Sequence, residues 1–432
     1  MSQFDKNACN EYNELSRRQV LGAGAFGLMS LAIPDWLPKV VLANDFVSNR
    51  DVIVQIYLRG GCDGLSVCVP YGDSALYTHR PNIAVAPPRR NGSRGTTSID
   101  LDGFFALPGS LALLYEIFLN RGLAIVHATG STDPSRSHFD AQRYMEVGKP
   151  QDASISTGWL GRHLATSQPM RSGAPLRGLG MSFGLQQTLA GGPLSVPVPD
   201  PSNFNIDGDS TTRAARRAWL SQQYANEQAM LQAAAINTQA TIDLLGTIGF
   251  STYTSSGTMA YPSTTMGNSL RMTAALIKAD VGVEAIAIDM GGWDTHSNQG
   301  ATTGTMANNM AQLGNALRAF YEDLVGQGRF GNVTTVIMSE FGRTVRENSS
   351  AGTDHGHGNV MLLMGGNVNG GLVHTNGWPG LSAANLYQGQ DLAIKIDHRD
   401  VLAEVIANRL GNGANLGTIL PNYTPTPRGI VL

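Results

Sequence analysis

The sequence predicts an α/β fold, a three-layer sandwich in which helices cover both faces of a mainly parallel sheet. Two observations lead to this prediction. Short runs rich in β-branched residues recur along the chain, and each run stops at small and polar residues. Stretches with helical periodicity lie between these runs. Strands that alternate with helices favour a parallel sheet that is covered on both faces.

The predicted elements follow one another along the chain in this alternating order. Strands are predicted within 51–58, 122–131, 282–291, 332–339 and 357–366, and helices within 109–122, 137–148, 212–246 and 305–328. Two segments, 86–103 and 253–269, are rich in glycine, serine and proline and are expected to be surface loops.

The first segment, residues 1–43, has the composition of an export signal. Arg17 and Arg18 precede a short apolar run, and "VVLAND" offers a cleavage point after Ala43. The apolar run is too short to span a bilayer, and paired arginines before it are typical of a twin-arginine signal peptide. We expect the twin-arginine export machinery to deliver the protein to the periplasm or the medium. The alternative is a buried N-terminal helix with two exposed arginines.

The remaining residues, 44–432, are predicted to form a single domain with loop insertions. The formal net charge of the whole chain is -3, so there is no basic field that would hold nucleic acid. No second apolar run approaches the length of a membrane span. Cys62 and Cys68 remain after the signal, and an oxidising compartment would allow them to pair, but the sequence leaves this pairing open.

Acidic residues and histidines follow several of the predicted strands. Asp63 follows the first strand, Glu340 closes a later one, and Asp294 and His296 lie one residue apart in "GGWDTH". Ligands of parallel sheets bind beyond the carboxyl ends of the strands, so these loops should converge on one edge. Each residue alone has a structural explanation, because Asp63 could form a turn and Arg343 could pair with Glu340.

The stretch "GTDHGHG" at 352–358 places Asp354, His355 and His357 among glycines. It is either a flexible polar turn or part of a metal site, since glycine allows backbone angles that turn several side chains toward one ion. Together with the carboxylates above, these histidines suit one or two divalent metal ions. Zinc or manganese is favoured, and calcium is also compatible with the carboxylates.

Five motifs appear in a characteristic order: "RGGCDGLS", "SRSHFDAQ", "GGWDTH", "SEFGR" and "GTDHGHG". In this order they resemble a family of twin-arginine-exported bacterial proteins of unknown function, which is similar to the alkaline phosphatase and sulfatase-like superfamily. The resemblance covers nearly the whole chain after the signal. It implies an alkaline phosphatase-like sandwich that binds metal ions.

The resemblance also assigns metal ligands. In the superfamily, the aspartate that ends the first strand and a second carboxylate share one metal ion, and these positions fall on Asp63 and Glu340. The partner ion takes an aspartate, a nearby histidine and a later histidine. Those positions fall on Asp294, on His296, and on His357 or His355, with Asp354 either a ligand or a residue that orients an imidazole.

The nucleophile of that superfamily lies at a helix N-terminus after the second strand. This position corresponds to Ser137, with Thr132 as the alternative. Arg136, Arg59 or Arg343 could clamp the substrate anion. Ser137 also has a structural explanation as a helix cap. A formylglycine sulfatase would need cysteine or serine at Thr132, so the resemblance argues against that class.

Three functions remain open from the sequence. The first is an exported metal-dependent hydrolase of phosphate or sulfate esters, acting on a small anionic ester. The alternative is a non-catalytic binding or structural protein of the cell envelope on the same scaffold. A metal-assisted hydrolase of carbohydrates or amides is the third.

Overall fold

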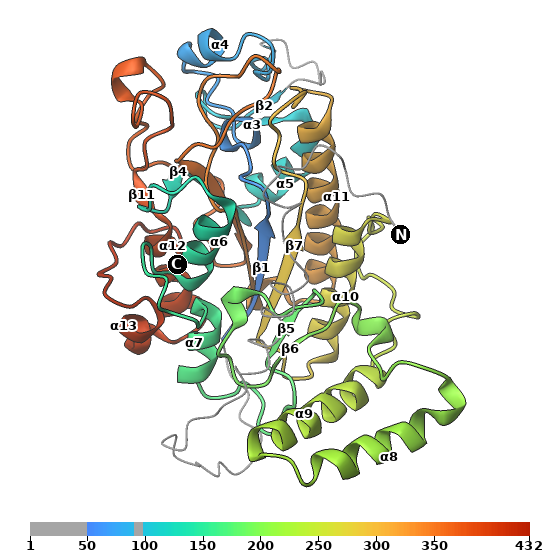
Figure 1. Cartoon of the computed structure of the whole chain (residues 1–432). Helices are drawn as coiled ribbons and strands as arrows, with labels where there is room; N and C mark the ends of the chain where they lie inside the picture. Colours follow the sequence, from blue (N-terminus) through green and yellow to red (C-terminus); the bar gives the residue numbers. More distant parts are fainter. Residues whose placement is uncertain (1–49, 90–97) are drawn as a thin grey trace.

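The computed structural model describes residues 50–89 and 98–432 (Figure 1). The predicted signal peptide, residues 1–43, lies outside the described residues. Among the described residues, no helix combines the length and apolar character that crossing a membrane requires. Cys62 and Cys68 are both buried and do not form a disulfide.

A nine-stranded, mainly parallel sheet forms the centre of the molecule. Its order is β10 (Val373–His374), β4 (Leu123–Gly130), β9 (Asn359–Gly365), β8 (Val333–Met338), β1 (Val52–Leu58), β7 (Ala285–Met290), β5 (Gly178–Gly180) and β6 (Ser195–Pro197), and β11 (Ile396–Asp397) also pairs with β4. Strand β9 runs antiparallel to both of its neighbours, β4 and β8. The start of β9 therefore lies at the same edge as the carboxyl ends of β1, β4, β7 and β8.

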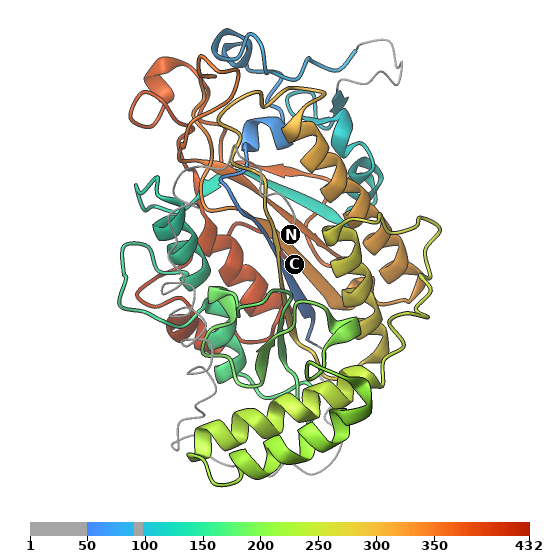
Figure 2. The ribbon, with the colours of Figure 1, turned by 45° about the vertical axis from the view of Figure 1, so that its right-hand side comes forward.

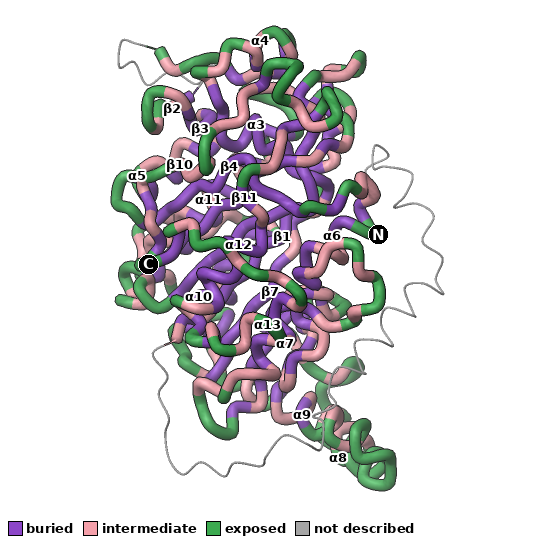
Figure 3. The backbone as a smooth tube through the Cα atoms, turned by 90° about the vertical axis from the view of Figure 1, so that its left-hand side faces the viewer, coloured by how far each residue is buried: buried purple, intermediate pink, exposed green. Residues whose placement is uncertain are grey.

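The side chains of β1 show why both faces of the sheet are covered. Val54 and Ile56 enter one hydrophobic core and Ile53 and Tyr57 enter the other, because successive strand residues point to opposite faces. The first core is completed by α5 (Leu114–Leu119), α10 (Thr265–Ala279) and α11 (Thr305–Gly326), and the second by α6 (His138–Val147), α7 (Trp159–Thr166), α12 (His398–Glu404) and α13 (Leu416–Ile419). Figure 3 shows the buried strands between these layers. The predicted three-layer sandwich is confirmed.

A third, smaller core covers one end of the sheet. It involves α3 (Gly64–Val67), α4 (Ala75–His79) and β3 (Ala106–Pro108). Strand β3 pairs in antiparallel fashion with β2 (Ser98–Asp100). Short 3-10 helices lie at Gly109–Leu111, Gln187–Leu189, Pro201–Asn203, Ser210–Thr212, Phe330–Asn332, Ala383–Asn385 and Gly413–Asn415, and a π-helical turn spans Val405–Arg409.

The continuous helix predicted over 212–246 is wrong. The structure divides it into α8 (Arg213–Tyr224) and α9 (Ala229–Gly246), which form a hairpin at one end of the molecule (Figure 2). Contacts across the hairpin favour this turn: Arg217 pairs with Asp243 at 2.6 Å, and Ser221 bonds to Gln239 at 3.2 Å. No residue of α8 is buried.

Candidate metal centre

Loops from three parts of the chain meet at the carboxyl edge of the sheet. Asp294 and His296 follow β7, and His138 is the first residue of α6, which follows β4. His355 precedes the antiparallel strand β9 and so reaches the same edge. The reversed direction of β9 is therefore what brings His355 to these loops.

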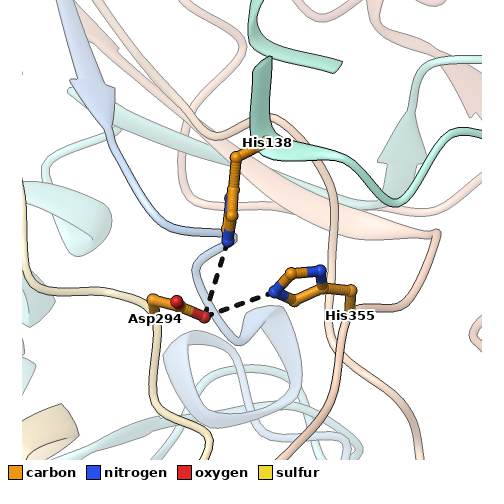
Figure 4. A group of neighbouring side chains, drawn as sticks. All are labelled: His138, Asp294 and His355. Carbon is orange, nitrogen blue, oxygen red and sulfur yellow. Dashed lines mark hydrogen bonds and ion pairs between the residues drawn. The ribbon is translucent and has the colours of Figure 1, made fainter. Parts of the chain in front are cut away.

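Three imidazole nitrogens converge on one carboxylate oxygen. The Nε2 atoms of His138, His296 and His355 lie 3.6, 3.0 and 3.4 Å from Asp294 Oδ1. The Nε2 atoms of His296 and His355 are 2.9 Å apart. Figure 4 shows His138 and His355 pointing at Asp294, and the ligand atoms of these three residues all lie within 4.8 Å of one another.

The other ring nitrogen of each histidine contacts a hydrogen-bond acceptor. His138 Nδ1 lies 2.8 Å from Glu340 Oε1, and His296 Nδ1 lies 3.0 Å from Asp354 Oδ1. His355 Nδ1 lies 2.7 Å from the backbone oxygen of Arg136. Each Nδ1 must therefore donate its proton, so a neutral imidazole presents its Nε2 lone pair to the centre.

The electrostatics of this centre favour a cation. Burial lowers the pKa of His138, but hydrogen bonds with Asp294 and Glu340 outweigh it and raise that pKa to about 9. A hydrogen bond with Asp294 likewise raises the pKa of His296. Burial raises the pKa of Asp294, but the three histidines and Arg343 more than offset it and hold that pKa well below its usual range. Without a proton or a metal ion, the Nε2 lone pairs of His296 and His355 would face each other unfavourably.

The donor set fits zinc. Two ligands on a tetrahedral zinc ion at about 2.0–2.1 Å lie roughly 3.3 Å apart, and the contacts among Asp294, His296 and His355 span 2.9 to 3.4 Å. Asp294 Oδ2 is buried and has no hydrogen-bond partner among the described residues, so it is a second oxygen available to an ion. Imidazole nitrogen suits zinc better than calcium, which prefers oxygen ligands.

The site is open on one side. The side chain of His296 is 34% exposed, whereas that of His138 is fully buried. Arg343 fixes the loop from the buried side, since its guanidinium donates to Asp294 Oδ1 at 2.5 Å and to the backbone oxygen of Gly61 at 2.6 Å. An ion held here would be within reach of solvent near His296.

The structure brings together some of the predicted ligands and separates others. Asp294, His296 and His355 form the cluster, and Glu340 and Asp354 lie behind it as partners of its imidazoles. His357 instead stacks on Tyr387, with ring centroids 4.1 Å apart. Burial, assisted by the charge of Arg136, lowers the pKa of His357 to about 4.

Asp63 is bound by other protein groups. Its carboxylate accepts hydrogen bonds from Arg80, Ser66 and Gln299, with donor distances of 2.6 to 3.0 Å. Gln299 in turn accepts bonds from Thr295 and Thr353, in the loops that carry the histidines. Asp63 therefore supports these loops through hydrogen bonds.

The predicted catalytic residues lie at and before the start of α6. Ser137 is the N-cap of α6, but its side chain makes no capping hydrogen bond. Arg136 contributes its backbone oxygen to His355, while its guanidinium binds Asp391 at 2.6 Å and Gln388 at 3.0 Å. Thr132 is exposed.

The sequence reasoning missed His138, which directly follows the proposed nucleophile Ser137. The signal was present in "SRSHFDAQ", since a histidine at the first position of a helix after a strand faces the same edge as the other loops. In the sequence the hydroxyl of Ser137 is the more conspicuous group, because hydroxyl groups are common nucleophiles.

Comparison with known proteins gives one family and several distant structures. The family described as "Protein of unknown function (DUF1501)" matches residues 120–414. No curated protein matches the chain.

Among solved structures, the PsFucS1 sulfatase from Pseudoalteromonas sp. is 12% identical, with 96% of this chain and 74% of that chain covered and a TM-score of 0.38. The C-terminal periplasmic domain of EcEptC from Escherichia coli is 11% identical over 89% of this chain and 90% of that one, with a TM-score of 0.34. An alkaline phosphatase superfamily protein from Vibrio parahaemolyticus is 8% identical over 82% and 70%, with a TM-score of 0.28.

Proposed function

We propose that this chain, which belongs to the DUF1501 family of proteins of unknown function, is an exported metal-dependent hydrolase of phosphate or sulfate esters. The proposal rests on the chain's own residues. The observation that carries the proposal is the convergence of three imidazole Nε2 atoms on Asp294 Oδ1 at an edge that opens to solvent. The paired residues Arg17 and Arg18 support export to the periplasm or the medium by the twin-arginine route.

Asp294, His138, His296 and His355 would hold the metal ion. Bound there, a zinc ion would act as a Lewis acid that activates a hydroxyl or a water and neutralises an anionic ester oxygen. Glu340, Asp354 and the Arg136 carbonyl keep each imidazole in the orientation and tautomer that ligation needs.

Ser137 is the first candidate for the nucleophile, with exposed Thr132 as the alternative. The Ser137 hydroxyl makes no capping hydrogen bond, and Ser137 directly precedes His138 in the chain, which supports this choice. Its position at the N-terminus of the ten-residue helix α6 favours an anionic substrate, since backbone amides there attract negative charge. A small anionic ester is therefore the proposed substrate class.

The proposal is tested by metal content and ester hydrolysis together. We expect the purified protein to contain bound zinc or manganese and to hydrolyse at least one chromogenic phosphate or sulfate ester. Asp294→Asn and His355→Ala should lower both metal content and rate. His374→Ala, which removes an imidazole from β10 whose Nε2 lies 2.9 Å from the Asn369 carbonyl, is the control and should change neither.

Two results would count against the proposal. Hydrolysis that persists in the Asp294→Asn and His355→Ala variants would place the chemistry elsewhere. Bound metal with no hydrolysis of any phosphate or sulfate ester would favour the alternative, a non-catalytic binding protein of the cell envelope.

A further inference from the structure

We infer that the centre holds one metal ion and not a pair, because the two carboxylates assigned by resemblance to the other ion are already bound by the protein's own donors. These carboxylates are Asp63 and Glu340. The inference rests on the proposed metal centre. It concerns how many ions that centre binds and which protein group takes the place of a second ion.

Asp63 is paired with a buried arginine. Arg80 NH1 lies 2.6 Å from Asp63 Oδ2, and Arg80 NH2 lies 3.0 Å from Asp63 Oδ1, which is a two-pronged contact. Ser66 Oγ and Gln299 Nε2 add further bonds to Oδ2, at 2.6 and 2.7 Å. Both side chains of the ion pair are only 1% exposed. A guanidinium stays protonated at all ordinary pH values, so a permanent positive charge already binds both oxygens of Asp63. Arg343 binds only Oδ1 of Asp294, whose Oδ2 has no hydrogen-bond partner among the described residues.

Arg80 is also held in place from behind. Its Nε donates to the backbone oxygen of Val345 at 2.8 Å, and its NH2 donates to that of Thr344 at 2.9 Å. For a metal ion to bind Asp63, the Arg80 guanidinium would have to move away from its four acceptor atoms. It would stay buried, so water could not replace those acceptors. Displacement of this kind leaves a buried unpaired charge, which strongly disfavours it.

Glu340 is bound by donors on both oxygens. Its Oε1 accepts from the Gly60 amide at 2.8 Å, from Gln142 at 2.9 Å and from His138 Nδ1 at 2.8 Å. Its Oε2 lies 2.9 Å from Ser339 Oγ, which shares its one proton with the Leu58 backbone oxygen at 2.6 Å. The carboxylate is fully buried and points its charge at an imidazole. Glu340 is therefore a positioning residue for His138 and acts through it.

This arrangement has a consequence for metal dependence. Arg80 places a permanent positive charge beside Asp63 that does not exchange with solvent. A second metal ion is therefore not needed to balance the Asp63 carboxylate. Zinc binding should follow a single-site curve, and any activity should rise with zinc in one phase.

The test is the number of zinc ions per chain, measured by elemental analysis of the full purified protein after dialysis, and by titration of the metal-free protein with zinc. We expect one ion per chain. The double variant Asp63→Asn, Arg80→Met removes both charges and keeps an acceptor for Ser66 and Gln299. It should still bind one zinc ion, with an affinity that falls by less than the roughly 10- to 100-fold expected for the loss of an outer partner of a ligand.

Glu340→Gln tests the positioning role. It should also bind one ion, but with an affinity about 10- to 100-fold weaker, as expected when an outer partner of a histidine ligand is lost. The cobalt-substituted protein gives a readout that a merely structural role would not move. Its visible absorption spectrum should be unchanged in the Asp63 and Arg80 double variant and altered in Glu340→Gln.

The outcomes separate the inference from the proposed function. Two zinc ions in wild type overturn the inference and leave the hydrolase proposal standing, and loss of one of them in the double variant would identify Asp63 as a ligand. One ion without ester hydrolysis supports the inference and overturns the proposed function. Wild-type protein that binds neither zinc nor manganese overturns both. If the double variant does not fold, the wild-type ion count still decides.

Discussion

Substituting Asp354 with alanine should weaken metal binding while sparing the fold. Asp354 Oδ1 accepts the hydrogen bond from His296 Nδ1 at 3.0 Å, yet its side chain is 59% exposed. Removing an exposed side chain usually changes the free energy of unfolding by about 0.5 kcal/mol or less. Removing a partner that orients a metal-binding histidine typically lowers metal affinity about 10- to 100-fold. The two effects can therefore be measured apart.

The magnitude follows from mass action. At a free zinc concentration of about 100 times the wild-type dissociation constant, zinc stabilises the folded wild-type protein by about 2.7 kcal/mol. If Asp354→Ala weakens binding 10-fold, the same concentration gives about 1.4 kcal/mol, and a 100-fold loss leaves about 0.4 kcal/mol. The metal-free proteins should unfold at nearly the same denaturant concentration.

The assay is equilibrium unfolding in urea, with and without zinc, followed by circular dichroism. Asp243→Ala is the matched control, because Asp243 is also an exposed carboxylate in an ion pair, with Arg217 on the α8–α9 hairpin. Zinc should stabilise this control as much as wild type. Equal stabilisation of Asp354→Ala and wild type would refute the role given to Asp354 in orienting His296.

Three further predictions use other parts of the chain. Changing Arg17 and Arg18 together to lysine should leave the precursor in the cytoplasm, and normal periplasmic accumulation on cell fractionation would contradict the export signal. His355→Ala should abolish high-affinity zinc binding in calorimetry whereas His357→Ala should keep it, because only His355 points at Asp294; the reverse result would make His357 the ligand. Burial lowers the pKa of His127 to about 4, so the folded protein keeps this imidazole neutral while the unfolded chain takes up a proton below about pH 6.5. Stability from this residue is therefore present above pH 6.5 and declines by up to about 1.4 kcal/mol per pH unit between pH 6.5 and 4. Urea unfolding at several pH values should show a shallower decline in His127→Gln, and identical slopes would contradict this account.

The architecture was predictable because strand signals are local. The run "VIVQIYL" of β1 and the run "NVMLLMG" of β9 each carry their own apolar character, and alternation with helices fixes the layers. The break between α8 and α9 was not predictable in the same way. No glycine or proline marks 225–228, and the turn is stabilised by contacts such as that of Arg217 with Asp243, which only the folded hairpin reveals.

The candidate site was predictable as a region and less so as a set of ligands. Asp294, His296 and His355 follow or precede strands, so their common edge could be inferred. The partners of Asp63 could not be inferred, because Arg80 lies beyond two short helices and nothing in its sequence context marks it as buried. Which side chains bind one another depends on how the loops pack, and no local sequence pattern predicts that packing.

The candidate metal centre depends on contacts between segments that lie far apart in the chain. Arg136 and His355, joined by a hydrogen bond, lie 219 positions apart in the chain, and Asp294 lies 61 positions before His355. Contacts between such distant segments form late, because loop closure costs entropy before any contact repays it. A ribosome-bound chain that has not yet emerged past residue 355 cannot present all the ligands. The proposed metal ion would therefore bind a site that is complete only after these distant segments have met.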